Sequence, residues 1–265
     1  MNSPFPWPGG KRALQKTLLA LIPKHKIYAE VFAGSAKLLF AKDAAHLEVM
    51  NDLNGDVTNF FRVAKHRPAE LAERFELECI HAERFRNLRA KPELEDEIDR
   101  ALRFAYLVWY SFGAKGQHFA SSSGRCPKAK RPLDRVRALL QMTAQRLSAV
   151  LIEQKDFAEI LPRYDSTETF FYLDPPYVTF QANGRYQPLT KDHRIKLFAL
   201  LANLKGKFLM SFDDCAEIRA LSRNHKFKMR NVGVVYTIGG AGERKASPEL
   251  LISNFALESL GINRA

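Results

Sequence analysis

Strand-like and helix-like patterns of apolar residues alternate along the first part of the chain. The short apolar runs 27–32 (IYAEVF) and 46–52 (HLEVMND) predict buried strands. Residues 35–42 and 55–68 carry apolar residues at helical spacing, and Pro68 predicts the end of the second helix. A strand–helix–strand order of this kind predicts a parallel sheet.

The pattern becomes helical from about residue 69 to residue 148. This part includes helical runs at 93–112 and 132–149, joined by a basic loop with Gly and Ser. Strand patterns then return at 149–156, 169–174, 207–213, 228–238 and 249–255. The predicted fold is a doubly wound, Rossmann-like α/β sheet, mostly parallel, with an antiparallel C-terminal strand pair. We expect a first half at 1–68, a small helical inserted domain at 69–148, and a second half at 149–265.

The charge of the chain indicates a class of partner. Its 265 residues carry a formal net charge of +12, and a basic surface is typical of proteins that bind nucleic acid. Residues 113–137 hold seven Lys or Arg against one acid, which predicts a segment that contacts phosphates, with a solvated loop as the alternative. The candidate phosphate-binding residues are Lys115, Arg125, Lys128, Lys130 and Arg131.

Several classes of protein do not fit the sequence. The longest apolar runs fall short of a membrane span, and the N-terminus lacks the apolar stretch of a signal peptide. The three cysteines form no C-x-x-C and the seven histidines form no H-x-x-x-H. We therefore expect a cytoplasmic protein with no membrane contact, no disulfide framework and no structural metal.

Acidic residues recur where the predicted strands end. Asp52, Asp156, Asp174 and Asp213 each lie at or just after a strand, and Glu30 precedes the turn after the first one. In doubly wound sheets ligands bind beyond the carboxyl ends of the strands, so these residues are candidates for a binding site.

Two short motifs in the first half predict ligand contacts. In FAGSA (32–36), Gly34 permits a tight turn and a close approach, although the motif is not the G-x-G-x-x-G of dinucleotide sites. Asp52, eighteen residues later, can accept hydrogen bonds from ribose hydroxyls or can cap a helix. In PFPWPGGKR, Trp7 either packs in the core or stacks on a ligand, and Lys11 follows no phosphate-loop spacing.

The motif LDPPY carries the most specific chemistry. Pro175 and Pro176 have fixed φ and no N–H, so this corner is stiff and its carbonyls are available acceptors. Together with the Asp174 carboxylate they can hold both hydrogens of an exocyclic amino group. Tyr177 offers a flat face on which a base can stack. A loop terminator followed by a packing Tyr is the structural alternative.

In sequence and in order, these motifs resemble the Dam-type adenine-specific DNA methyltransferases, which use S-adenosylmethionine. The likeness rests on WPGGKRAL, YAEVFAGSAKLLFAK, NDLNGDVTNFFRVAK, QKDFAEIL, LDPPY and RKASPELLISN, and covers most of the chain. It implies that one group of residues surrounds the cofactor: Trp7, Lys11, Phe32, Gly34, Asp52, Asp156, Phe157 and Asp174. It implies that another group meets the target base: Asp174, Pro175, Pro176 and Tyr177.

The chain also departs from the family pattern. Val31 stands where the family often has Pro, and Ala36 stands where it often has the second Gly of the cofactor loop. The extra methyl group of Ala36 is expected to crowd the methionine part of the cofactor. The F-N-x-P-x-G-like hairpin of members that recognise GATC is absent.

The resemblance predicts transfer of a methyl group from S-adenosylmethionine to N6 of an adenine flipped out of double-stranded DNA. We expect the protein to be encoded by a bacterium or a phage, and a cognate restriction enzyme is a candidate partner. The alternatives are an N4-cytosine methyltransferase, a protein glutamine methyltransferase, typically N-P-P-Y, and an inactive DNA-binding module, which Ala36 motivates.

Overall fold

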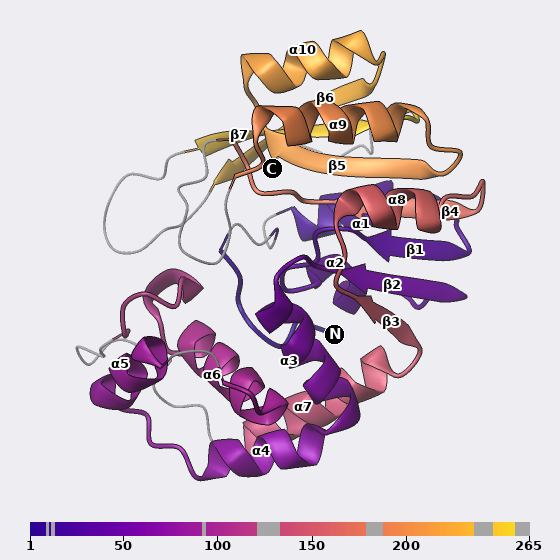
Figure 1. Ribbon diagram of the computed structural model, residues 1–265. Helices are drawn as coiled ribbons and strands as arrows, with labels where there is room; N and C mark the ends of the chain where they lie inside the picture. Colours follow the sequence, from indigo (N-terminus) through magenta and orange to yellow (C-terminus); the bar gives the residue numbers. More distant parts are fainter. Residues whose placement is uncertain are drawn as a thin grey trace.

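The strands of the computed structural model form one mixed sheet (Figure 1). The structure describes residues 1–8, 11, 14–91, 94–120, 133–178, 188–235 and 246–257. In these ranges the sheet has seven strands in the order β3-β2-β1-β4-β5-β7-β6. Their bounds are β1 Ile27–Glu30, β2 Leu47–Asn51, β3 Val150–Glu153, β4 Thr169–Leu173, β5 Lys207–Asp213, β6 Lys228–Val235 and β7 Ala246–Ser253.

Strand direction and order confirm the predicted α/β fold. Strands β1 to β5 pair in parallel, whereas β7 is antiparallel both to β5 and to β6. The strand order reverses between β1 and β4, and a doubly wound sheet opens a crevice for ligands at such a point. A ligand site is therefore expected at the chain segments that follow β1 and β4.

Helices cover both faces of the sheet (Figure 1). One face carries α1 (Gln15–Leu21), α2 (Lys37–Ala41), α3 (Gly55–His66) and α7 (Leu133–Leu147). The other carries α8 (Phe157–Arg163), α9 (Lys191–Ala202) and α10 (Ala216–Asn224). Along β4, Phe170 and Tyr172 pack into the core on the face covered by α1, α2, α3 and α7. Phe171 and Leu173 pack into the core on the face covered by α8, α9 and α10. A strand buried on both faces has no polar side to show, which explains its unbroken apolar run.

The helices α4 (Pro68–Glu76), α6 (Glu97–Trp109) and α7 pack beside α3, and α5 (Ala82–Ala90) packs on α6. All four helices lie away from β5 to β7 (Figure 1). Helix α3 ends just before the predicted stop at Pro68. Arg67 separates the two helices, and Pro68 begins α4, where a missing N–H costs nothing. These helices share one continuous core with one face of the sheet. The division of the chain at 68/69 and 148/149 into separate domains stays a prediction.

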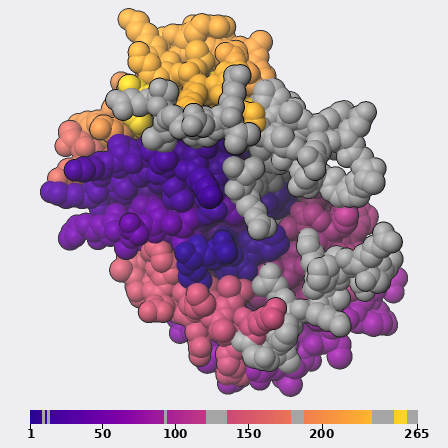
Figure 2. Space-filling view, turned by 180° about the vertical axis from the view of Figure 1, so that it is seen from behind, coloured from indigo at the N-terminus to yellow at the C-terminus, as the bar shows by residue number. Residues whose placement is uncertain are grey.

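The N-terminal segment lies between the sheet and the helices (Figure 2). Phe5 is buried against Phe60 and Phe61 of α3 and Phe104 of α6, with ring centroids 5.2–5.3 Å apart. The Trp109 indole also donates to the Pro4 carbonyl oxygen at 3.2 Å. This packing anchors the start of the chain near Lys11, whose ammonium lies beside Asp174 at the end of β4.

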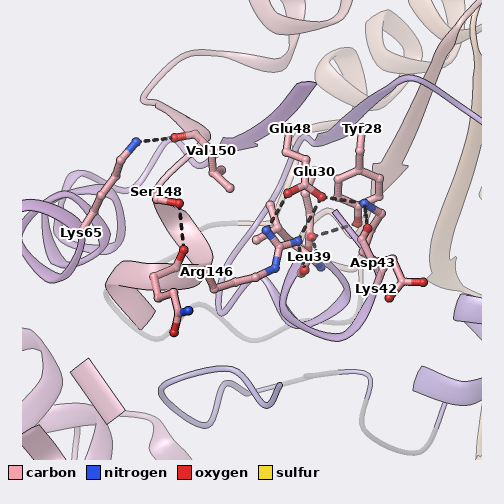
Figure 3. A network of polar contacts seen from close by, with 11 residues as sticks. Tyr28, Glu30, Leu39, Lys42, Asp43, Glu48, Lys65, Arg146, Ser148 and Val150 are labelled. Carbon is pink, nitrogen blue, oxygen red and sulfur yellow. Dashed lines mark hydrogen bonds and ion pairs between the residues drawn. The ribbon is translucent and has the colours of Figure 1, made fainter. Parts of the chain in front are cut away.

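Buried ion pairs attach α7 to the sheet (Figure 3). Arg146 donates to both carboxylate oxygens of Glu48 on β2, at 2.6 and 3.0 Å, and Lys42 donates to Glu48 at 2.6 Å. The side chain of Glu48 is only 4% exposed. Both carboxylate oxygens of this buried acid are thus paired.

Candidate active site

Asp174, the first residue after β4, lies beside the neighbouring strand β5. Its Oδ1 accepts a hydrogen bond from the Ser211 hydroxyl at 3.1 Å, and this hydroxyl also lies 3.1 Å from the Tyr172 hydroxyl. Pro175 is buried and Pro176 partly buried, so the corner that follows is packed on its inner side. Asp174 is thereby held by residues of β4 and β5 at the crevice that the strand order predicts.

Lys11 is the second partner of Asp174. Its Nζ lies 2.7 Å from Asp174 Oδ1 and 3.2 Å from Glu249 Oε1, and the side chains of Lys11 and Glu249 are 4% and 2% exposed. The Asp174 side chain is 23% exposed. In the described part of the chain, every hydrogen bond or ion pair to this carboxylate reaches Oδ1, so Oδ2 remains available to a ligand.

Tyr177 is fixed at both ends of its side chain. Its ring stacks on Phe212, with centroids 5.6 Å apart and planes 19° from parallel, and its hydroxyl donates to Glu249 Oε1. The ammonium of Lys11 lies 4.6 Å from the ring centroid. The next amide, of Val178, donates to Asp213 Oδ1 at 3.2 Å. Strands β5 and β7 thus hold the whole D-P-P-Y corner in one conformation.

The electrostatics make Asp174 more basic than an ordinary aspartate. Burial raises the pKa of its carboxyl, the nearby Lys11 charge lowers it in part, and the Glu249 charge raises it again. A second buried acid, Glu30 at the end of β1, has its pKa raised to about 8 by burial. It accepts hydrogen bonds from the Tyr28 hydroxyl and the Leu39 amide, both at 3.0 Å.

Gly34 and Asp52 meet at the ends of β1 and β2. The Gly34 amide donates to Asp52 Oδ2 at 2.7 Å, and the Asn54 amide donates to Oδ1 at 2.9 Å. The side chain that caps α3 is Asn54, which accepts from the amides of Asp56 and Val57, so Asp52 is not the helix cap. Gly34 adopts φ +50°, and a Cβ there would lie 2.7 Å from the Trp7 indole nitrogen. The turn therefore requires glycine for its conformation and for Trp7.

The structure gives several other predicted cofactor residues a packing role. Trp7 is half-buried, and its ring centroid lies 5.6 Å from that of Phe5, which favours the core alternative. Phe157 is 4% exposed and packs beside the partly exposed Phe32, with centroids 5.9 Å apart. Asp156 caps α8 by accepting from the Ala158 amide at 2.9 Å. Trp7, Phe32 and Asp156 all keep exposed surface that a ligand can contact.

The departure at Ala36 has a structural consequence of another kind. Ala36 adopts a left-handed conformation, with φ 51° and ψ 41°, which costs an alanine about 1 kcal/mol or more. The residue is fully buried within the core cluster below α2. Its methyl group therefore lines no open space, and the expected crowding of a ligand has no support in this geometry.

Three residues of the D-P-P-Y environment, namely Ser211, Asp213 and Glu249, are not identified as its partners by sequence patterns. Asp213 stands out in the sequence only as one of the acids at the strand ends, and Glu249 lies within RKASPELLISN, a motif that does not indicate which residues it contacts. Of the predicted phosphate contacts, Lys115 is exposed after α6. The others, Arg125, Lys128, Lys130 and Arg131, lie outside the described residues.

Two other kinds of site are absent from the described residues. In these ranges no helix combines the length and the apolar character needed to cross a bilayer. The same residues contain no group of three or more His, Cys, Asp or Glu that could hold a metal ion.

Comparisons with known proteins show which family the chain matches. Residues 7–238 match the family described as D12 class N6 adenine-specific DNA methyltransferase. The chain is 24% identical to the type II methyltransferase M1.LlaDCHI of Lactococcus lactis subsp. cremoris, over 94% of each chain. It is 25% identical to a DNA adenine methylase of Salmonella typhi, over 92% of each chain. It is 23% identical to the type II methyltransferase M.CviBI of Paramecium bursaria Chlorella virus NC1A, over 94% of this chain and 98% of that one.

One solved structure, described as a precorrin 8W decarboxylase from Methanobacterium thermoautotrophicum, aligns with 97% of this chain and 96% of its own. Its TM-score of 0.45 and identity of 10% are too low to carry any argument about function. The family match covers most of the chain and includes the D-P-P-Y corner, Lys11 and strands β4 and β5. The chain belongs to the D12 class of N6 adenine-specific DNA methyltransferases.

Proposed function

We propose that this DNA adenine-N6 methyltransferase takes its methyl group from S-adenosylmethionine and acts on an adenine flipped out of duplex DNA. The observation that carries the proposal is the state of Asp174. One carboxylate oxygen is held by Lys11 and Ser211, and the other accepts nothing from the described residues while the side chain is partly exposed. A carboxylate arranged in this way is ready to accept a hydrogen bond from a ligand.

The target amino group would be held by two acceptors. Asp174 Oδ2 accepts one hydrogen of N6, and a backbone carbonyl of the Pro175–Pro176 step accepts the other. This pairing draws the nitrogen toward a tetrahedral shape and leaves its lone pair free to attack. Preorganised acceptors of this kind act without reorganisation during the reaction, which is the usual source of electrostatic catalysis.

The flipped base would stack on Tyr177. Leaving the DNA helix costs a base a few kcal/mol, and stacking on an aromatic ring returns about 1–3 kcal/mol. The stacking of Tyr177 on Phe212 and its hydroxyl contact with Glu249 keep this ring from rotating away. Tyr177 therefore both orients the adenine and offsets part of the cost of extruding it.

The residues at the ends of β1 to β3 fit a nucleoside-bearing methyl donor. Asp156, which keeps exposed surface, supplies a carboxylate for a hydroxyl group, and Phe32 and the 65% exposed Leu53 supply apolar surface for a heterocycle. Asp52 is 2% exposed and accepts hydrogen bonds from the amides of Gly34 and Asn54, so its part is to shape the turn beside the donor. S-adenosylmethionine supplies a methyl group on a sulfonium, an electrophile that needs no activation by the protein. The role of the protein at this end of the site is to bind and to orient.

The transfer balances with the groups that are present. The N6 lone pair forms the new bond to carbon while the bond from sulfur to that carbon breaks, and N6 becomes positively charged. N6 then loses a proton, which Asp174 Oδ2 is placed to accept. Because burial raises the pKa of Asp174, its carboxylate accepts a proton more readily than an ordinary aspartate does.

Two wider expectations belong to this proposal. The type II methyltransferases among the relatives support a restriction enzyme of the same recognition sequence as a partner. DNA as the substrate supports a cytoplasmic location in a bacterial cell, including a cell that carries a phage.

The test is to identify the methylated nucleoside. The protein is incubated with methyl-labelled S-adenosylmethionine and duplex DNA of mixed sequence, and the DNA is digested and separated by chromatography. We expect the label in N6-methyladenine. Label in N4-methylcytosine would reassign the base, and label only in RNA or protein would overturn the proposal. Binding of donor and DNA without any label would indicate an inactive DNA-binding protein.

A further inference from the structure

Glu249 is a buried acid in the candidate active site, and it lies within the motif RKASPELLISN without an assigned role. It lies on β7, which pairs with both β5 and β6, and it is 1% exposed. Its Oε1 lies 3.2 Å from the Lys11 ammonium and accepts a hydrogen bond from the Tyr177 hydroxyl. Burying a carboxylate costs several kcal/mol before its partners compensate, so such a group needs a specific reason to be there.

Its position in the sheet makes the burial more costly. In the antiparallel pairing of β5 with β7, Glu249 lies directly opposite Asp213, which is also buried. Like charges directly opposite each other destabilise a sheet. An apolar residue would suit strand β7 better, and local violations of this kind concentrate at functional sites.

The contacts of the two acids give the reason. Glu249 holds the Tyr177 hydroxyl, Asp213 holds the Val178 amide, and Ser211 holds Asp174. Every one of these contacts ends on the D-P-P-Y corner or on the residue that follows it. Glu249 also pairs with Lys11, the residue whose ammonium pairs with Asp174.

We propose that Glu249 is a positioning residue for methyl transfer, which holds Lys11 between two carboxylates and fixes the Tyr177 hydroxyl, so that Asp174 keeps Oδ2 for the target amino group. The inference rests on the proposed function and names a further residue of the same site. With Glu249 present, Lys11, Asp174 and Glu249 together carry one net negative charge next to the nitrogen that becomes positive. Without the Glu249 charge, the Lys11–Asp174 pair is neutral, and the net negative charge next to the target nitrogen is lost.

The variant Glu249→Gln tests this role, because glutamine keeps the shape and can still accept the Tyr177 hydroxyl. Removal of the charge lowers the pKa of Asp174, since Glu249 is one cause of its rise. We therefore expect the acid limb of kcat to move to lower pH and the plateau to fall by about 10-fold or more. Among the residues that the structure describes, the charged and titratable groups around Asp174 are Lys11, Glu30, Tyr172, Tyr177 and Glu249.

Glu48→Gln is the matched control. It also removes the charge of a buried, ion-paired carboxylate, but one that lies in the cluster with Lys42 and Arg146 (Figure 3). We expect it to lower the melting temperature and to leave the acid limb where it is. If Glu249→Gln behaves in the same way, with a lower melting temperature and an unmoved limb, Glu249 is merely structural and the proposal is wrong.

A measurement without catalysis separates this inference from the proposed function. The Asp174 carboxyl is titrated by ¹³C NMR in the wild-type protein and in Glu249→Gln. A lower pKa of Asp174 in the variant supports the positioning role even if no methylated base is found, and an unchanged or higher pKa overturns it. Glu249→Asp, which retains the charge, is a second variant and should titrate closer to wild type than Glu249→Gln does.

Discussion

At the scale of single residues, the central feature is one ammonium placed between two buried carboxylates. Lys11 lowers the pKa of Asp174, while burial and Glu249 raise it, and the net shift is upward. A base with a raised pKa is a better proton acceptor but loses its charge at a higher pH. The acid limb of methylation should therefore lie above the range of an ordinary aspartate.

The variant Lys11→Met tests this balance. Without the ammonium, the pKa of Asp174 should rise further, because a lowering influence has been removed. The acid limb of kcat should then move to higher pH, measured from turnover with saturating DNA and donor across a pH series. Lys26→Met, which alters an exposed ion pair with Glu168, is the control and should leave the limb unchanged. A limb that does not move in Lys11→Met would mean that Asp174 does not set it.

At the scale of elements, one buried amide joins the strand ends that carry the site. Asn51, which is 1% exposed, donates to the carbonyl oxygens of Val31 and Lys155 at 2.9 and 3.0 Å and accepts from the Lys155 amide at 2.9 Å. These hydrogen bonds connect the ends of β1, β2 and β3. They hold the turn with Gly34 and the cap residue Asp156 at fixed positions.

Asn51→Ala should lower the free energy of unfolding by about 2–3 kcal/mol, because it leaves buried backbone groups without partners. It should also weaken binding of the methyl donor, since three strand ends are no longer joined by one side chain. Urea unfolding and calorimetry measure the two effects. The exposed Asn203→Ala, which removes one hydrogen bond to Ala199, should change stability by less than about 0.5 kcal/mol. Equal effects of the two variants would contradict this account of Asn51.

Helix α7 provides a direct comparison of a buried and an exposed ion pair. Arg146 pairs with the buried Glu48, whereas Arg137 pairs with Glu76 where both side chains are about two-fifths exposed (41% and 38%). Arg146→Met should cost about 3 kcal/mol, because it takes a partner from a buried charge. Arg137→Met should cost less than about 1 kcal/mol. Chemical denaturation of both variants decides, and similar losses of stability would show that burial does not control the difference.

The elements themselves are largely predictable from the sequence, and the reasons are local. Apolar runs predict the strands of the described sheet because strands such as β4 are buried on both faces, and D-P-P-Y is recognisable because its chemistry is contiguous. The partners of that motif are not predictable as partners. Ser211 lies in an apolar strand run, and the motif RKASPELLISN contains Glu249 without indicating its contacts with Tyr177 and Lys11. Lys11 meets Asp174 because the N-terminal segment packs between α3 and α6 through Phe5. Interactions of this range depend on the packed fold.

At the scale of the whole molecule, charge should control how the protein meets DNA. The chain carries a net charge of +12, with a basic run at 113–137 whose main cluster lies outside the described residues. Neutralising Lys128, Lys130 and Arg131 together should weaken DNA binding and reduce the log–log salt slope by roughly 0.9 for each phosphate that these residues neutralise in the wild-type complex. Binding of the methyl donor should not change.

A second triple variant controls for net charge. Lys24, Lys205 and Lys207 are exposed at the opposite edge of the sheet, where β1 and β5 begin. Their neutralisation removes the same formal charge and should leave the salt slope near wild type, as measured by fluorescence anisotropy at several salt concentrations. If both triple variants lower the slope equally, the basic segment acts through overall charge and does not bind phosphates locally.

The most direct test of the central claim is a single-turnover measurement with Asp174→Asn. Asparagine keeps the size of the side chain but removes the charge that accepts the amino hydrogen and the released proton. With DNA and methyl donor both bound, formation of N6-methyladenine should slow by about 100-fold or more, while the melting temperature and the donor affinity stay close to wild type. A rate within a few-fold of wild type would contradict the claim that Asp174 carries the reaction.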